Sequence, residues 1–381
     1  MKVTVVCDVL GEKNNGTTIA AYNLIESLKK KGHEVRVVCS DEERRGQEGF
    51  FVCPTFDFGP LNNYVKKNGV APAKADMAVL EAALCDVDII HVMIPFSMGK
   101  AAAHYAHEHG IPLTAGFHCQ AENVTGHIFL KDVRLAGRIA YRAFYNRVYK
   151  YCDGIHYPSR FICDTFEDVV GPTPRYIISN GVAKEFRPVP CEKPEELRDK
   201  FTVLFIGRYS PEKSHKVLID AAALSKYKDK LRLVFAGAGP LEEKLRERAK
   251  KRGLNEPVMK FFSREELVRT INTADLYVHP AEIEIEAISC LEAIACGRTP
   301  LIADSPRSAT RAFALGENNL FRVNDPADLA KKLDFWIEHP EEREKCSRDY
   351  LGYASRFDFD RCMDRMEEMM ISVVRNKKNE G

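Results

Sequence analysis

The chain has 381 residues, of which 45% are hydrophobic and 29% are charged. This composition is typical of a soluble globular protein and excludes a disordered or fibrous one, while the length predicts two domains at roughly 150 residues each. Lysine and arginine total 56 against 55 for aspartate and glutamate, so the nearly neutral chain is not expected to bind nucleic acid. No apolar run approaches the roughly 18 residues of a membrane span.

The twelve cysteines are scattered along the chain and form no C-x-x-C pair. Several of them, such as Cys7, Cys39 and Cys290, lie inside apolar runs, which is the usage of small buried hydrophobic residues in a reducing compartment. We therefore expect a cytoplasmic protein. Residues 1–10 are too few and too polar for a signal peptide and are interpreted as part of a first strand.

The N-terminal half alternates short apolar runs with amphipathic stretches, which is typical of a parallel sheet covered on both faces. Strands are predicted at residues 3–7, 34–39, 87–92, 113–117 and 154–157, and a helix at residues 18–31. We therefore expect residues 1–187 to form one doubly wound α/β domain. The segment 187–200 contains three prolines and is interpreted as an interdomain linker.

The same alternation then starts again, which predicts a second α/β domain over residues 200–355. Its strands are predicted at residues 203–206, 231–236, 276–279 and 299–303, and its helices at residues 214–226, 241–251 and 287–296. The tail is amphipathic and rich in methionine. We expect residues 356–381 to form a helix that packs back on the N-terminal domain.

Two loops after predicted strands carry candidate ligand-binding groups. Gly16 precedes the first helix, where close backbone approach and free N–H groups favour an anion, but a plain turn with a threonine N-cap is the simpler explanation. Arg208 and Lys213 follow the strand at residues 203–206, at the edge where doubly wound sheets bind ligands. They could hold a diphosphate, each charge-assisted bond being worth about 1.5–3 kcal/mol, and a solvated loop is an equal alternative.

A third segment is acidic. Glu282, Glu284 and Glu286 precede a predicted helix, and Glu292 lies inside it. Carboxylates accept hydrogen bonds from sugar hydroxyls, and amides at a helix start bind phosphates. An acidic first turn that complements the helix dipole explains Glu286 but not Glu292, which lies within an apolar helix.

From Glu284 to Glu292, and on through Ala-Ile-Ala-Cys-Gly at residues 293–297, the chain resembles the E-x7-E signature of glycosyltransferase family 4. Further segments similar to the family, in the same order and over nearly the whole chain, are Gly16, Phe117-His118, Asn180-Gly181-Val182, Gly207-Arg208 with Glu212-Lys213, and Gly237-Ala238-Gly239-Pro240. The resemblance implies an α/β protein of the GT-B fold, with two Rossmann-like doubly wound domains facing each other across a cleft. It also implies a retaining transferase.

The resemblance implies a role for each matched residue. Arg208 and Lys213 would bind the diphosphate of a nucleotide-sugar donor, and Glu292 would bind its ribose. Glu284 would contact the transferred sugar. His118 would stabilise that sugar in the reacting complex, through its backbone or its ring. Such enzymes have no obvious protein nucleophile, so the leaving phosphate would act as the base while the protein positions the reactants and stabilises charge.

One segment departs from the family pattern. The family usually carries Gly-Phe-Gly after the first glutamate, whereas this chain has Ile285-Glu286-Ala287. Backbone amides of these residues would contact the donor. Similar glutamate-rich variants occur in members that glycosylate membrane lipids such as diacylglycerol, and residues 91–100 also resemble that lipid-directed branch.

Several residues could in principle hold a metal ion. The segments 86–88 and 358–360 spell the D-x-D motif of other glycosyltransferases, and His104, His107 and His109 could bind zinc. Turn formation, helix capping and the helix dipole explain these residues more simply. We expect no metal and no cofactor beyond the nucleotide-sugar co-substrate, a UDP-hexose.

Residues 131–150 contain six basic residues and one acid. Arg134, Arg138 and Arg142 recur every four residues and so share one face of a predicted helix, with apolar and aromatic residues between them. Such a helix can lie on an anionic bilayer. The alternative is a solvated helix whose apolar side packs on the sheet.

These features together predict a retaining hexosyltransferase that transfers glucose or galactose from UDP-hexose to a membrane lipid, diacylglycerol first and ceramide second. The expected location is the cytoplasm, peripherally associated with the inner face of the cell membrane. A transferase of the same fold that acts on a soluble glycan or metabolite would need no lipid. A nucleotide-sugar epimerase would convert the donor without an acceptor, and a non-catalytic relic is disfavoured because the matched charged residues are present.

Overall fold

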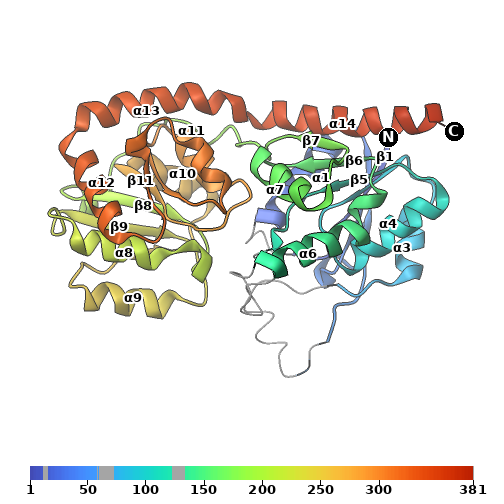
Figure 1. The fold of residues 1–381 in the computed structure, drawn as a ribbon, viewed down its shortest axis with the longest axis horizontal. Coiled ribbons are helices and arrows are strands. Elements are labelled where there is room, and N and C mark those ends of the chain that lie inside the picture. Colours follow the sequence, from blue (N-terminus) through green and yellow to red (C-terminus); the bar gives the residue numbers. More distant parts are fainter. Residues whose placement is uncertain (12–15, 58, 60–72, 122–133, 381) are drawn as a thin grey trace. The chain divides into compact units, whose positions relative to one another are not determined.

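The computed structural model describes residues 1–11, 16–57, 59, 73–121 and 134–380. This part of the chain divides into two compact units (Figure 1). The first unit contains Met1–Asn180 and Arg361–Gly381, and the second contains Gly181–Asp360. Each unit is built on one parallel sheet.

The sheet of the first unit has seven strands in the order β3-β2-β1-β4-β5-β6-β7. They are β1 (Lys2–Val6), β2 (Glu34–Cys39), β3 (Phe50–Val52), β4 (Ile89–Val92), β5 (Leu113–Gly116), β6 (Gly154–Tyr157) and β7 (Arg175–Ile177). All neighbouring pairs are parallel, and the register places Val5 between Val37 and His91. The central strands β4, β5 and β6 are buried along their whole length, because helices cover both faces of these apolar runs.

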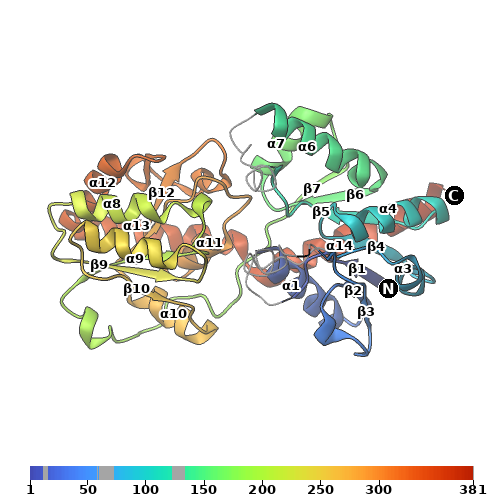
Figure 2. The same ribbon diagram turned by 90° about the horizontal axis from the view of Figure 1, so that it is seen from below.

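Helices flank this sheet on both sides. They are α1 (Gly16–Lys30), α3 (Met77–Leu84), α4 (Ser97–His109), α6 (Arg134–Arg147), α7 (Arg160–Val170) and α14 (Phe359–Glu380). In Figures 1 and 2, α4 lies on one side of the sheet and α14 on the other. The buried face of α14 carries Met363, Met366, Met369, Met370 and Val373.

The start of α4 is capped by a side chain from the end of β1. Asp8 Oδ1 accepts the N–H of Met98 (2.7 Å) and Asp8 Oδ2 accepts the N–H of Gly99 (3.0 Å). Burial raises the pKa of the Asp8 carboxyl to about 6, against the lowering effect of these N–H groups. A Cβ on Gly99 would lie 2.3 Å from the carbonyl oxygen of Ile94, so only glycine fits this close approach.

The sheet of the second unit has six parallel strands in the order β10-β9-β8-β11-β12-β13. The strands are β8 (Phe201–Ile206), β9 (Leu231–Ala236), β10 (Val258–Lys260), β11 (Leu276–His279), β12 (Pro300–Asp304) and β13 (Leu320–Arg322). The helices are α8 (His215–Leu224), α9 (Glu242–Lys251), α10 (Arg264–Thr273), α11 (Ile288–Ala295), α12 (Pro326–Glu338) and α13 (Pro340–Ala354). In both units the first strand lies between the second and the fourth, which is the doubly wound arrangement that the sequence predicted.

The proline-rich segment 187–200, interpreted from the sequence as a linker, is part of the second unit. Leu197 is buried in the core of that unit. Lys193 Nζ donates to Asp275 Oδ2 (2.5 Å) and to the carbonyl oxygen of Lys200 (2.7 Å). These contacts fix the segment beside β8, so the second unit begins at Gly181 and not at residue 200.

Within the described ranges, no helix combines the length and the apolar character that crossing a bilayer requires.

Candidate active site

Loops that follow β8, β11 and β12 are tied together at the carboxyl edge of the second unit's sheet. The N–H of Glu282, after β11, donates to the carbonyl oxygen of Glu212, after β8 (2.9 Å). The N–H of Ala309, after β12, donates to the carbonyl oxygen of Glu284 (2.9 Å). The loop with Lys213 and the acidic segment therefore form one site, at the edge where doubly wound sheets bind ligands.

The turn after β9 packs directly on the loop after β8. A Cβ on Gly237 would lie 2.2 Å from the carbonyl oxygen of Gly207, and a Cβ on Gly239 would lie 2.7 Å from the backbone nitrogen of Tyr209. The N–H of Tyr209 donates to the carbonyl oxygen of Ala238 (3.0 Å). The two glycines thus let the backbones approach closely, and a side chain at either position would displace the loop that carries Arg208 and Lys213.

Lys213 and Glu284 form a largely buried ion pair in this site. Lys213 Nζ donates to Glu284 Oε1, and the two side chains are 22% and 12% exposed. Burial raises the pKa of the Glu284 carboxyl, but the charge of Lys213 and the neighbouring His279 together bring it down to about 2. A carboxylate, which can accept hydrogen bonds from hydroxyls, and a cation, which can bind an anion, therefore lie side by side at neutral pH.

Two residues that the sequence analysis did not single out, Tyr277 and His279, lie next to Glu284 in a chain of polar contacts. His279 is fully buried on β11, and its Nε2 lies 3.3 Å from Glu284 Oε1. Its Nδ1 lies 3.0 Å from the hydroxyl of Tyr277, which is also fully buried. Burial lowers the pKa of His279, so the ring is neutral. If the phenol donates to Nδ1, the imidazole proton is on Nε2 and faces the carboxylate.

The signal for this pair was present in the sequence. Residues 277 and 279 alternate along a strand and so point to the same face. Both are polar within an otherwise apolar run that leads into the acidic segment. Buried polar groups usually lie near other polar groups, and the carboxylate nearest to His279 Nε2 is that of Glu284.

The segment at residues 285–287 leads into α11. Ala287 is the N-cap of this helix, with φ 62° and ψ 70°, and its own side chain makes no capping hydrogen bond. This left-handed conformation costs an L residue about 1–2 kcal/mol and favours glycine. Ile285 is partly buried and Glu286 is buried. A glycine would relieve the backbone at Ala287, the position where the family pattern has its second glycine.

Glu292 lies within α11 and is partly exposed. Burial raises the pKa of its carboxyl to about 8; the charge of Arg264 lowers the pKa and that of Glu185 raises it. Arg264 and Glu185 form an ion pair with each other. A large fraction of Glu292 is therefore protonated at pH 7, in contrast to Glu284 in the same segment.

Arg208 is partly exposed and lies on the same loop as Lys213. The structure thus places Arg208, Lys213, Glu284 and Glu292 in the second unit and brings Lys213 and Glu284 into contact.

Gly16 and His118 belong to the first unit. Gly16 is the first residue of α1, and the next residue, Thr17, donates through Oγ1 to the carbonyl oxygen of His118 (3.3 Å). Burial lowers the pKa of His118 well below its usual range, with smaller contributions from His156 and His91. The ring is therefore neutral at pH 7. Residues 12–15, which precede Gly16, lie outside the described residues.

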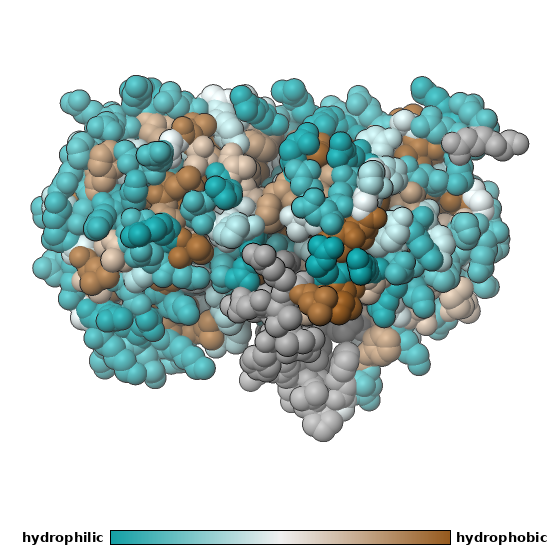
Figure 3. Space-filling model, in the orientation of Figure 1, coloured by the Kyte–Doolittle hydropathy of each residue, from teal (hydrophilic) through white to brown (hydrophobic). Residues whose placement is uncertain are grey.

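The outer face of α6 combines arginines with exposed apolar side chains. Leu135 and Ile139 are 66% and 59% exposed, and Arg138 and Arg142 are exposed beside them. Arg134 begins the helix, but its side chain lies outside the described part. Figure 3 shows hydrophobic and hydrophilic atoms next to each other on the face of the molecule that carries α6 in Figure 1.

The residues weighed as metal ligands have other partners. Asp86 forms an ion pair with Lys2 (2.5 Å), and His104 and His107 pack on the ring of Tyr151, with centroids 5.1 and 5.0 Å away. Among the residues whose structure is described, no three histidine, cysteine, aspartate or glutamate side chains are arranged to hold a metal ion.

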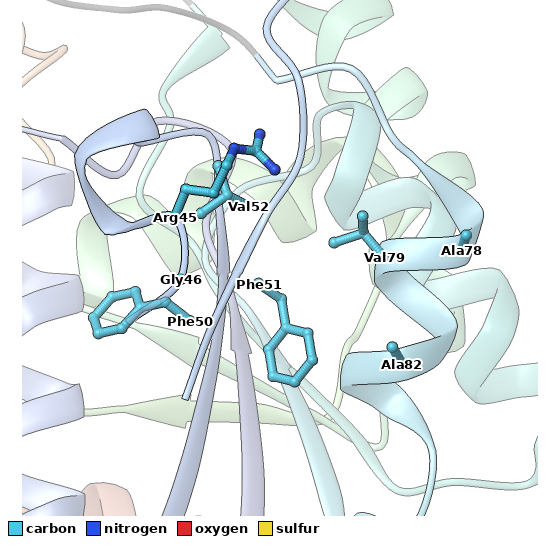
Figure 4. Close-up of a pocket in the computed structure, with 8 residues that line it drawn as sticks. All are labelled: Arg45, Gly46, Phe50, Phe51, Val52, Ala78, Val79 and Ala82. Atoms are coloured by element: carbon cyan, nitrogen blue, oxygen red, sulfur yellow. The ribbon is translucent and has the colours of Figure 1, made fainter. Parts of the chain in front are cut away.

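A separate hollow of about 390 Å³ lies beside the edge strand β3 (Figure 4). Phe51 and Val52 of β3 line one side, and Val79 and Ala82 of α3 line the other, with Arg45 near one end. None of the candidate site residues lines this hollow. It is therefore distinct from the charged site in the second unit.

Comparisons with known proteins agree with this arrangement. The model of Glycosyltransferase Family 4 matches residues 14–186, and that of Glycosyl transferases group 1 matches residues 191–349. The α-monoglucosyldiacylglycerol synthase of Streptococcus pneumoniae is 27% identical over 321 residues, which are 80% of this chain and 71% of that protein. A GDP-mannose-dependent α-mannosyltransferase of Corynebacterium glutamicum is 27% identical over 383 residues, covering 93% of this chain and 85% of that protein.

The fold is shared with a solved structure over nearly the whole chain. Anabaena HepE in complex with UDP-glucose superimposes with a TM-score of 0.76 at 17% identity, over 98% of this chain and 100% of that chain. The catalytic domain of cholesterol-α-glucosyltransferase from Helicobacter pylori is 46% identical over 41% of this chain and 98% of that chain, with a TM-score of 0.40.

Two Rossmann-like units and these matches define a glycosyltransferase of the GT-B fold. More specifically, the chain belongs to glycosyltransferase family 4. The fold and the family predicted from the sequence are both confirmed.

Proposed function

We propose that this glycosyltransferase transfers a hexose, glucose or galactose, from UDP-hexose to a hydroxyl of a membrane lipid, with retention of the anomeric configuration. Diacylglycerol is the first acceptor and ceramide the second. The observation that carries the proposal is the Lys213–Glu284 pair at the carboxyl edge of the second unit. A relative named for glucosylated diacylglycerol and a fold neighbour holding UDP-glucose support the choice of acceptor and donor.

The donor would be held by groups of the second unit. Lys213 and Arg208 would bind the diphosphate, assisted by the first-turn N–H groups of α11, which carry the positive end of the helix dipole. Glu284 would accept hydrogen bonds from hydroxyls of the hexose, and Glu292 from those of the ribose. These are the assignments of the family resemblance, and the contact between Lys213 and Glu284 supports two of them.

In the proposed reaction, the acceptor hydroxyl oxygen forms a bond to the anomeric carbon as the bond from that carbon to the diphosphate oxygen breaks. The departing diphosphate takes the hydroxyl proton. Acceptor and leaving group are on the same face of the sugar, so the configuration is retained. Lys213 and Arg208 would stabilise the charge that develops on the diphosphate, and His118 would hold the sugar from the first unit.

The outer face of α6 would bring the enzyme to its lipid acceptor. Tyr141 and Phe144 are buried, as expected for a helix that packs on its own unit. That packing does not account for Leu135 and Ile139, which are exposed beside two arginines. Apolar side chains that insert at the headgroup level, flanked by cations, are the chemistry of a helix lying on an anionic bilayer. We therefore place the enzyme at the inner face of the cell membrane.

Product analysis tests the proposed reaction. The protein is incubated separately with UDP-glucose, UDP-galactose and GDP-mannose, each with vesicles containing diacylglycerol, ceramide or cholesterol, or with soluble sugars. Mass spectrometry should detect a hexosylated lipid with a UDP-hexose, and NMR should show the α-anomer. The Lys213→Ala variant is the control for site-specific activity. Transfer from GDP-mannose alone, transfer to soluble acceptors alone, or a β-linked product would contradict the corresponding part of the proposal.

Vesicle binding tests the membrane face. An Arg138→Glu and Arg142→Glu double variant should lose binding to anionic vesicles at low salt, because each arginine near the surface contributes about 1 kcal/mol. High salt should release the unmodified protein as well, since surface attraction is screened. The matched control is Lys244→Glu with Lys250→Glu, the same charge change on the exposed side of α9. Equal binding of anionic vesicles by both double variants would contradict the proposal that α6 binds the membrane.

A further inference from the structure

Three histidines lie together at the carboxyl end of the first unit's sheet. His91 is on β4, His156 is on β6, and His118 follows β5 between them. His91 Nδ1 lies 2.9 Å from the hydroxyl of Thr114, and His156 Nε2 donates to the carbonyl oxygen of Ile178 (2.7 Å). The ring centroids of His118 and His156 are 5.4 Å apart, with their planes at 64°. His91 and His156 are thus fixed, and His118 packs edge-on against one of them.

Gly116 provides the space for the His118 ring. A Cβ built on Gly116 would lie 2.5 Å from His118 Nε2, 2.6 Å from its Cδ2 and 3.6 Å from His91 Nε2. Non-bonded carbon and nitrogen atoms pack at about 3.5–4 Å, so the ring occupies the volume that any other residue at this position would fill. The imidazole is therefore folded back over the end of β5.

The backbone at His118 is held from both sides. The preceding Phe117 is fully buried, its N–H donates to the carbonyl oxygen of His156 (2.8 Å), and its ring centroid lies 4.7 Å from that of Phe166. The carbonyl oxygen of His118 itself accepts the hydroxyl of Thr17 (3.3 Å). These hydrogen bonds hold the backbone at Phe117 and at the carbonyl of His118, and the contact with His156 adds a constraint on the His118 ring.

Burial also defines the chemical state of the ring. It lowers the pKa of His156 to about 4 and that of His91 to about 3, and it lowers the pKa of His118 as well. Three imidazoles that are neutral at pH 7 do not repel one another, and none of them brings a positive charge to the site. The contribution of His118 must then depend on where its backbone and ring are held.

We propose that Gly116 and His156 are positioning residues for His118, the first through the space it leaves and the second through its ring edge. They set the position of the His118 backbone beside the start of α1, from which His118 contacts the transferred sugar. This inference rests on the proposed function for the role of His118, but the packing that it describes can be tested without that function.

A double-mutant cycle tests the proposal. Gly116→Ala, His118→Ala and the double variant are compared for kcat, for KM of UDP-hexose and for thermal unfolding. A displacement of about 1 Å can lower turnover by up to roughly a hundredfold, so Gly116→Ala should lower kcat at least about tenfold in the unmodified protein. In the His118→Ala background, where the ring is gone, the same change should alter kcat by less than about twofold and leave Tm nearly unchanged.

A second cycle uses His156→Ala with His118→Ala, in case Gly116→Ala does not fold. It too should show a loss of kcat that disappears when the His118 ring is absent, while the affinity for UDP, which the second unit binds, stays constant. Equal losses in both backgrounds, or unchanged kcat for both single variants, would overturn the positioning role while leaving the transferase intact. If the unmodified protein transfers no hexose, the proposed function fails. The packing is then tested by the Tm values alone. If the Tm change of each double variant equals the sum of the changes of its single variants, the proposed packing of the His118 ring is overturned.

Discussion

The two units share a strand order but use equivalent helices in opposite ways. α4 follows β4, and α11 follows β11. Each of these strands is the fourth of its unit along the chain and pairs with the first strand. In the first unit, the carboxylate of Asp8 caps α4 through two N–H groups. In the second unit, the N-cap of α11 is Ala287, whose own side chain makes no capping hydrogen bond. A protein anion thus caps the first helix start, whereas the N-cap residue of the second supplies no anion, and the proposed donor diphosphate would bind there.

The side chains at the carboxyl ends of the strands also differ in charge between the two units. The second unit presents an ammonium beside a carboxylate, Lys213 and Glu284. The first unit has neutral imidazoles at His91, His118 and His156, of which His91 and His156 are buried. One fold can therefore carry charged side chains at the strand ends in one copy and neutral imidazoles in the other. The following predictions test this contrast.

The largest expected effect is on transfer by Lys213→Ala. Removing the cation leaves the diphosphate less stabilised and Glu284 without its partner, so kcat/KM should fall by about two to three orders of magnitude. Steady-state kinetics with saturating acceptor measure this. Lys216→Ala, an exposed lysine at the start of α8, is the matched control and should stay within about threefold of the unmodified protein. Similar kinetics for both variants would mean that the pair does not bind the donor.

The pH dependence of UDP binding should report Glu292. Its carboxyl has a pKa of about 8, and only the carboxylate accepts two ribose hydroxyls, so binding must release a proton below that pH. The affinity for UDP should rise up to about tenfold per pH unit from pH 7 and level off above pH 8. Calorimetry in buffers of different ionisation enthalpy measures the proton release. Glu292→Gln should bind UDP weakly and without this slope; an identical slope in the variant would assign the proton to another group.

Asp8→Ala should affect stability and not donor binding. It leaves two N–H groups of α4 without their acceptor, at a cost of about 1–3 kcal/mol in the free energy of unfolding. Because burial raises the Asp8 pKa from 3.8 to about 6, the folded state binds more protons between these values. The stability of the unmodified protein should therefore fall as pH rises through this window, and that contribution should vanish in the variant.

Denaturant titrations at pH 4.5 and 6.5, together with UDP binding, measure both parts of the prediction for Asp8→Ala. A loss of UDP affinity comparable to that of Lys213→Ala would contradict the contrast between the two helix starts.

The smallest effect is expected for Ala287→Gly. The left-handed conformation of Ala287 disfavours alanine, while glycine adds flexibility to the unfolded chain, so the net gain in the free energy of unfolding should be at most about 1 kcal/mol. The control is Ala293→Gly inside α11, which should destabilise the protein by about 1 kcal/mol or more. Destabilisation by both changes would show that the turn before α11 does not require a glycine-like backbone.

The sequence predicted the central strands of both sheets but none of the four edge strands. β3, β7, β10 and β13 are three residues long and pair on one side only. β7, β10 and β13 each include a charged residue, Arg175, Lys260 and Arg322, so they lack the continuous apolar run that marks a buried strand. β3 is apolar throughout, but its three residues are too few to mark a strand on their own. Central strands are recognisable because both faces are buried, and edge strands depend on a neighbour that the local sequence does not reveal.

The candidate site shows the same limit. Lys213 and Glu284 are 71 residues apart and were matched by separate motifs, and only the fold brings them into contact. His279 and Tyr277 were missed because their alternation marks a polar face of the strand but does not identify Glu284 as the neighbour of His279. The segment 187–200 was misassigned because its prolines suggest a linker, whereas the burial of Leu197 and the ion pair of Lys193 tie it to the second unit.

Hydrogen–deuterium exchange with and without UDP tests most directly whether the second unit alone binds the nucleotide diphosphate. The account predicts slower exchange over residues 207–213 and 284–292 when UDP is added, and unchanged exchange at residues 97–100, where Asp8 already caps α4. The Lys213→Ala variant should lose this protection at the same UDP concentration. Protection at residues 97–100, or none in the second unit at saturating UDP, would contradict the account.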